Sequence, residues 1–225
     1  MEAYLSFSQE NLWYEIWPEL SLAIGAIVVL GINLFYKSDS KNGLSGSLAI
    51  LFQAILLVFH LFDYLAWHHT FDRTTFSGML HQGIQGDVMR SFFLLASLLV
   101  SIIGHRYIRK HSLRIGEFHH LVMLASAGLM LLCQSSHFVM LFVALECVAL
   151  CFYALVAFNR ESAKSLESGI KYLIFGALSS SFLLFGIVLL YGVGSNPEAW
   201  GATFYGAEVR DALSFGYLED LIREN

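Results

Sequence analysis

The chain has 225 residues, of which 56% are hydrophobic and only 14% are charged, with a formal net charge of −5. Soluble domains carry about a quarter charged residues, so this composition excludes an ordinary soluble protein. The acidic balance and the lack of a basic cluster exclude a nucleic-acid partner. Because the apolar runs are long and short alternating strands are missing, we predict an all-α integral membrane protein rather than a barrel.

Several apolar runs reach the length of about 20 residues that a helix needs to cross a bilayer. We predict spans at residues 19–36, 47–66, 90–105, 118–134, 138–158 and 169–192. The first twenty residues hold four glutamates and no Lys or Arg, unlike a signal peptide, so the first span is expected to stay in the mature protein. We expect three units: residues 1–117 with three spans, 118–194 with spans four to six, and a polar tail over 195–225.

Basic residues are unequally divided between the two sides of the predicted bundle. The connections after spans one, three and five hold eight: Lys37, Lys41, Arg106, Arg109, Lys110, Arg114, Arg160 and Lys164. The other side holds four: Arg73, Arg90, Arg210 and Arg223. The positive-inside rule therefore predicts a multi-pass membrane protein with both termini non-cytoplasmic. The tail is expected to form a short amphipathic helix on the outer surface.

Several polar groups offer only weak signals for a site. His60 and Asp63 lie three residues apart in the second span, where an interfacial hydrogen bond is favoured and a proton relay is the alternative. His68, His69, Asp72 and His81 share a loop whose spacing fits no zinc pattern. The cysteines Cys133, Cys147 and Cys151 form no Cys-x-x-Cys pair for an iron–sulfur cluster. We expect no metal or redox centre in this chain.

Glu146 is the most informative residue, because it lies at the middle of the fifth predicted span. A carboxylate at that depth is costly to insert, by about 2.5 kcal/mol or more, so it should face protein or water. Tyr153, two turns away, is the nearest polar group on the same face. Lys171 lies on the next, antiparallel helix, opposite a face of small residues that would let another helix approach closely. We predict a proton-exchanging Glu146–Lys171 pair with Tyr153 beside it, a hydrogen-bonded glutamate and a snorkelling lysine being the alternatives.

Short motifs between Arg106 and Ser195 then become recognisable. They are Gly116-Glu117-Phe118, Leu145-Glu146, the stretch 153–158, Ile170-Lys171-Tyr172, Gly176-Ala177 and the stretch 189–192, with Pro18-Glu19-Leu20 near the start. In these the chain resembles subunit N of the proton-pumping NADH-quinone oxidoreductases (respiratory complex I), an antiporter-like membrane subunit. The resemblance implies that Glu146 and Lys171 belong to a charged axis through the membrane. Cys151 departs from it, standing where the family usually has Pro.

The resemblance also implies a function and its alternatives. That family has about fourteen helices, so this chain is interpreted as an N-terminal portion or truncated form contributing part of a proton half-channel. NADH, FMN, iron–sulfur and quinone chemistry would belong to partner subunits. The partners would be other membrane subunits of the complex and the lipid bilayer, and the resemblance implies that this bilayer is the cell inner membrane. A subunit of a multisubunit cation/proton antiporter and a structural remnant that moves no ions are the two alternatives.

Overall fold

The computed structural model describes residues 13–35, 44–66, 73–110, 115–194, 213–216 and 219. A short 3-10 helix, η1 (Trp13–Ile16), leads into six long helices: α2 (Trp17–Phe35), α3 (Leu44–Ala66), α4 (Ile84–Lys110), α5 (Ile115–Gln134), α6 (Phe138–Val156) and α7 (Ala163–Gly194). These six are long and apolar enough to cross a membrane, which confirms the predicted spans. The chain is an all-α integral membrane protein.

Two helices are longer than the sequence predicted. α4 begins at Ile84 and ends at Lys110, and α7 begins at Ala163. Both extensions carry polar residues, which a hydropathy window excludes although they continue the helix beyond the hydrocarbon core. The predicted division of the chain after residue 117 lies within the first turn of α5.

A small hairpin within the connection from α3 to α4 was not predicted. Strands β1 (Arg73–Thr75) and β2 (Leu80–Gln82) pair antiparallel, and φ is positive at Phe76, Ser77 and Gly78 in their turn. The hydroxyl of Ser136 donates to the Gly78 carbonyl and its backbone N–H donates to the Met79 carbonyl at 2.9 Å, so the hairpin covers the α5–α6 connection. Strands of three residues are too short to show alternation.

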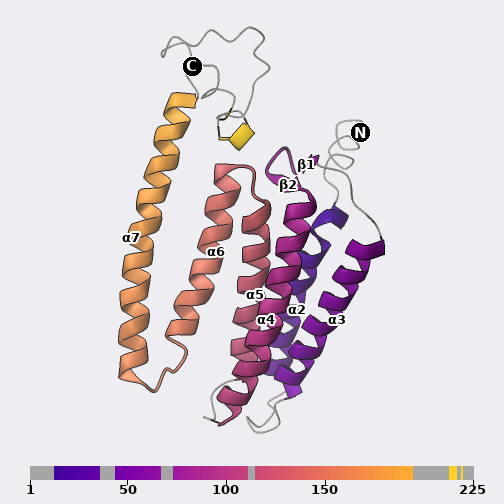
Figure 1. Cartoon of the computed structure of the whole chain (residues 1–225). Coiled ribbons are helices and arrows are strands. Elements are labelled where there is room, and N and C mark those ends of the chain that lie inside the picture. The colour runs from indigo at the N-terminus through magenta and orange to yellow at the C-terminus, as the bar shows by residue number, and fades with distance from the viewer. Residues whose placement is uncertain are drawn as a thin grey trace.

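The hairpin marks one end of the bundle, here called the hairpin end (Figure 1). α2, α4 and α6 begin there and α3 and α5 end there, whereas the α6–α7 connection lies at the opposite end, here called the loop end. Near the hairpin end, the Phe138 N–H donates to the Leu213 carbonyl at 3.0 Å and the rings of Phe138 and Phe215 are 4.6 Å apart. The remainder of the tail, with its predicted amphipathic helix, lies outside the described residues.

α5 is the central helix, packing on α2, α3, α4 and α6. The buried core is formed mainly where α2, α3, α4 and α5 meet, and includes Leu22, Ala26, Leu56, Leu94, Met123 and Met130. On the other side of α5, Gly128 allows α6 to approach, because a Cβ at Gly128 would lie 2.8 Å from Val148 Cγ2. α7 is peripheral and packs on α6, leaving most of its own surface exposed (Figure 1).

Candidate functional site

Glu146 lies on the face of α6 that is turned away from α5. Ala144, Val148 and Cys151 are buried on the α5 side, and Glu146 and Tyr153, seven residues apart, share the opposite side. The Glu146 Oε1 atom is buried and has no hydrogen-bond partner among the described residues. A buried oxygen without a partner costs about 1–3 kcal/mol, so a proton, a water molecule or a moving side chain would be stabilised there.

Tyr153 connects this face to α7. Its ring packs edge-on against Tyr172 with centroids 5.1 Å apart, and Gly176 leaves the space that the Tyr153 hydroxyl fills. Gly169 lies against Ala157 in the same way, so the small-residue face of α7 packs closely on another helix, as predicted. That helix is α6, which carries Glu146, whereas the prediction had the opposite, Lys171 face of α7 meeting Glu146. Cys151 is buried within α6, which continues as one helix through it to Val156.

Lys171 does not meet Glu146 in this structure. Its ammonium binds Glu167 one turn earlier, and the two side chains are 65% and 63% exposed. The contacts of Gly169 with Ala157 and of Gly176 with Tyr153 place Lys171 level with about residues 155–158 of α6. At 1.5 Å per residue this is about 14–18 Å from the level of Glu146. The predicted direct, buried Glu146–Lys171 pair is therefore not formed here.

The antiparallel register explains this correction. The close-packed side of α7 is occupied by glycines, so Lys171 on the opposite side points away from α6. The same register places Ser180 level with Glu146, on the small-residue side of α7. The Ser180 hydroxyl donates to the Ala177 carbonyl at 3.2 Å. Ser180 is thus the polar group of α7 that is best placed to reach the Glu146 carboxyl.

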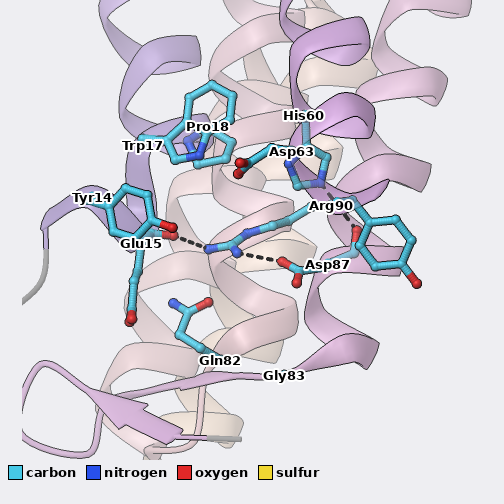
Figure 2. A pocket seen from close by; sticks show the side chains of 11 residues that line it. Tyr14, Glu15, Trp17, Pro18, His60, Asp63, Gln82, Gly83, Asp87 and Arg90 are labelled. Carbon is cyan, nitrogen blue, oxygen red and sulfur yellow. Dashed lines mark hydrogen bonds and ion pairs between the residues drawn. The ribbon is translucent and has the colours of Figure 1, made fainter. Parts of the chain in front are cut away.

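A second polar region lies at the hairpin end, where a cavity of about 60 Å³ opens between η1, α3 and α4 (Figure 2). It is lined by Tyr14, Glu15, Trp17, Pro18, His60, Asp63, Tyr64, Gln82, Gly83, Asp87 and Arg90. His60 and Asp63 share it, but no hydrogen bond between these two side chains is formed; His60 Nε2 instead lies 3.4 Å from the Asp87 carbonyl.

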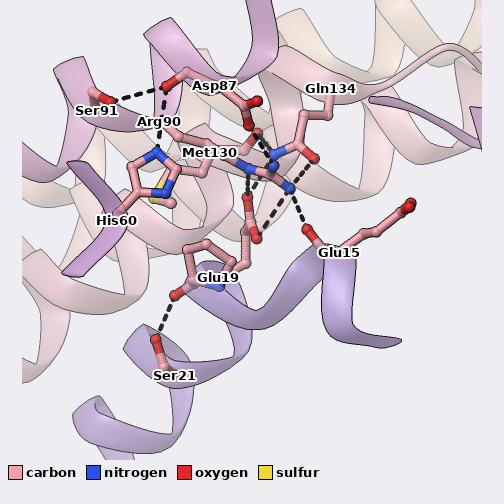
Figure 3. Close-up of polar contacts among 10 residues, drawn as sticks. Glu15, Glu19, Ser21, His60, Asp87, Arg90, Ser91, Met130 and Gln134 are labelled. Atoms are coloured by element: carbon pink, nitrogen blue, oxygen red, sulfur yellow. Dashed lines mark hydrogen bonds and ion pairs between the residues drawn. The ribbon is translucent and has the colours of Figure 1, made fainter. Parts of the chain in front are cut away.

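Arg90 is the centre of a buried ion network (Figure 3). Its Nε donates to Glu19 Oε1 at 2.7 Å and its Nη1 to Asp87 Oδ1 at 2.9 Å. Its Nη2 donates to the Glu15 carbonyl at 2.7 Å and to Gln134 Oε1 at 2.5 Å. The side chains of Arg90 and Glu19 are only 6% and 2% exposed. Such a fork of donors suits several acceptors at once, which a lysine could not satisfy.

The network joins three helices. Gln134 Nε2 donates to Glu19 Oε1 at 2.5 Å and to the Met130 carbonyl at 2.9 Å, so α2, α4 and α5 are fastened at one point. This group was not predicted from the sequence, because Arg90 was counted among the charges outside the spans and Glu19 was given no role. The sequence did contain a signal for it. Glu19 and Arg90 carry opposite charges, each stands where an apolar run begins, and both runs begin on the same side of the membrane.

The loop end carries a third set of polar groups. His105 Nδ1 lies 3.4 Å from His119 Nε2, and Arg160 Nη2 donates to Glu117 Oε2 at 3.2 Å. His137 lies at the other end, where its Nδ1 accepts from the Val139 N–H at 3.1 Å. Over the described residues no three His, Cys, Asp or Glu side chains are arranged to hold a metal ion. His68, His69 and Asp72 lie outside the described residues.

Comparison with known proteins connects α6 and α7 to a family. Residues 135–199 match the family described as "NADH:quinone oxidoreductase/Mrp antiporter, TM". The chain is 42% identical over 207 residues to "NADH-quinone oxidoreductase subunit N 1" of Opitutus terrae, covering 90% of this chain and 40% of that protein. It is 38% identical over 176 residues to "NADH-quinone oxidoreductase subunit N" of Xanthomonas euvesicatoria, covering 78% and 35%.

The chain is a homologue of NADH-quinone oxidoreductase subunit N. It spans about 40% of the length of the subunit N relatives that it matches. The fold agrees with a chain of "Respiratory complex I from Thermus thermophilus with bound Aureothin", with a TM-score of 0.60 at 24% identity over 92% of this chain and 42% of that one. It also agrees with a chain of an archaeal membrane-bound sulfane sulfur reductase, with a TM-score of 0.63 at 20% identity over 81% and 38%.

Proposed function

We propose that this subunit N homologue contributes part of a proton half-channel to a proton-translocating NADH-quinone oxidoreductase. The observation that carries the proposal concerns Glu146, at the middle of α6 and within the matched residues 135–199. Its Oε1 is buried and has no hydrogen-bond partner in the part of the chain that the structure describes. A carboxyl group held in that position can take up and release a proton, whereas a purely structural glutamate would be expected to have both oxygens bonded.

Glu146 and Lys171 are proposed to act through their charges rather than by contact. At about 15 Å and an effective dielectric constant near 20, two unit charges interact by about 1 kcal/mol. That is enough to shift the balance of an ion pair such as Lys171–Glu167 but too little to hold a proton. Two polar side chains lie where α6 and α7 face each other. Tyr153 lies between the levels of Glu146 and Lys171, and Ser180 lies at the level of Glu146. Both would shorten the distance that a proton must cross.

The remaining chemistry is assigned to partners. NADH, FMN, iron–sulfur clusters and quinone are proposed to be bound by other subunits. The exposed side of α7, with Ile174, Phe175, Phe182 and Phe185 each about two-thirds exposed, suits contact with further membrane helices or lipid. The cytoplasm is proposed to lie at the loop end.

The test uses inverted membrane vesicles from the source cells with and without the gene for this chain. We expect deletion to abolish most NADH-driven acidification of the vesicle lumen and plasmid-borne wild type to restore it, in buffer free of Na⁺. Unchanged acidification after deletion would support a non-translocating remnant. A pH change that needs added Na⁺ and no NADH would instead support the cation/proton antiporter.

The orientation is tested separately with a reporter enzyme that is active only in the cytoplasm. Fused after Lys110, at the loop end, the reporter is expected to be active, because Arg106, Arg109 and Lys110 favour retention on that side. Fused after Asn225 it is expected to be inactive. The reverse pattern would contradict the proposed orientation, and equal activity at both sites would contradict the three spans expected between the two fusion points.

A further inference from the structure

The last turn of α4 carries three exposed cations. Arg106, Arg109 and Lys110 form neither a hydrogen bond nor an ion pair within the part of the chain that the structure describes. The carboxylate of Glu117, in the first turn of the neighbouring α5, is bound to Arg160 with Oε2 and Nη2 3.2 Å apart. The positive charge at this end of α4 is therefore not balanced by the described acids.

Two of these cations continue an apolar stripe along the outer side of α4. At 3.6 residues per turn, Arg106 and Lys110 lie on the same side of the helix. That side also carries the apolar residues Ile103, Leu99 and Phe92, which are 69%, 51% and 58% exposed. The buried residues of α4 lie on the opposite side, where the helix packs on α3 and α5. The stripe therefore faces away from the bundle and ends in positive charge.

The change from apolar to charged residues falls at the edge of the membrane. α4 has 27 residues and is about 40 Å long at 1.5 Å per residue, whereas the hydrocarbon core of a bilayer is about 30 Å thick. The charged turn is the end of the helix that projects beyond this core. Arg106 lies about 5 Å and Lys110 about 10 Å beyond Ile103 along the helix axis. The two cations thus lie at the depth of lipid phosphate groups, directly beyond the stripe that acyl chains contact.

An anionic phospholipid complements this surface in both charge and polarity. A guanidinium donates two parallel hydrogen bonds to a phosphate and an ammonium adds a point charge, so Arg106 and Lys110 together can hold one phosphodiester. Each Lys or Arg near the membrane surface strengthens the binding of anionic lipid. A zwitterionic lipid brings an ammonium of its own, which the cations of α4 repel. A free phosphate would leave the apolar stripe uncovered.

We propose that the end of α4 is a binding site for an anionic phospholipid of the phosphatidylglycerol type. The lipid phosphate binds Arg106 and Lys110, while Arg109 adds attraction from one flank. One acyl chain lies along Ile103 and Leu99. The site is on a different helix from Glu146 and does not rest on the function proposed for that residue.

Lipid competition on the wild-type chain tests the proposal directly. The purified full chain in detergent is incubated with equal amounts of phosphatidylglycerol and phosphatidylcholine whose acyl chains differ in mass, and the bound lipid is counted by native mass spectrometry. We expect phosphatidylglycerol to be bound in about tenfold excess or more, as two cations on one anionic headgroup would produce. Inorganic phosphate should displace no more of it than sodium chloride at the same ionic strength, because phosphate has no acyl chain.

Two charge-matched double variants locate the site. Arg106→Gln with Lys110→Gln should reduce the preference for phosphatidylglycerol to about twofold or less. Arg160→Gln with Lys164→Gln should keep the preference, because it removes the same number of exposed cations from the same end of the bundle, at the connection from α6 to α7.

Three results would overturn the proposal. Equal binding of both lipids by the wild type would leave this face of α4 to a protein partner. Equal losses in the two double variants would show a general effect of surface charge. Displacement by phosphate beyond the salt control would make the ligand a free anion. No NADH or partner subunit is present, so the outcome is independent of proton pumping.

Discussion

Replacing Glu146 with Gln is expected to lower NADH-driven proton pumping by about tenfold or more in the assembled complex. Gln keeps the size and the hydrogen-bonding capacity of the side chain but cannot take up a proton, and a positioned proton-transfer group commonly contributes a large factor in rate. Glu146→Asp should retain part of the activity, because it keeps the carboxyl group on the same face of α6. Pumping is measured in inverted vesicles with a pH-sensitive dye, alongside the amount of assembled complex.

The matched control is Glu161→Gln, which removes an exposed carboxylate from the connection between α6 and α7. It should leave pumping near the wild-type level. Lys171→Met should also reduce pumping, but less, because its ammonium is about 65% exposed and lies more than 10 Å from the level of Glu146. Wild-type pumping by Glu146→Gln with normal assembly would show that Glu146 is structural, and the proposed mechanism would fail.

The long apolar runs made the six helices predictable from the sequence. A run of about 20 apolar residues has few alternatives to a membrane helix, so its position follows from hydropathy alone. The small-residue side of α7 was predictable for a similar reason, because Gly169 and Gly176 fall on one side at helical spacing and only small residues let two backbones approach closely. Their contacts with Ala157 and Tyr153 confirm it.

The sequence could not give the register between helices. Two residues 25 positions apart on antiparallel helices can be level or several turns apart, depending on the length of the connection and the depth at which each helix starts. Here the connection is short and α7 begins at Ala163, so Lys171 stays near the loop end while Glu146 lies at mid-helix. The Arg90 network was missed for the same reason: Glu19, Arg90 and Gln134 are brought together by three helices that begin or end at one level.

Replacing Arg90 with Leu is expected to destabilise the chain by about 3–5 kcal/mol, the largest stability effect that the structure predicts. Arg90 is the cationic partner of Glu19, whose side chain is 2% exposed, and removing one member of a buried pair leaves an uncompensated charge. Gln134 and the Glu15 carbonyl would lose a donor as well. The measurement is the thermal unfolding midpoint of the purified chain in detergent. Arg90→Lys should recover little, because one ammonium cannot reproduce the fork that reaches four acceptors.

The double variant Arg90→Leu with Glu19→Leu separates two explanations of that loss. If the destabilisation comes from the unpaired Glu19 carboxylate, removing Glu19 as well should recover most of the lost unfolding temperature. Apolar residues of similar size often replace a buried ion pair at little cost in stability. Asp87 is left in place, because its side chain is 15% exposed and borders the cavity, where water can contact it. If the double variant is instead as unstable as Arg90→Leu, the network is needed to hold α2, α4 and α5 together through its hydrogen bonds. Unchanged stability of Arg90→Leu would contradict both explanations.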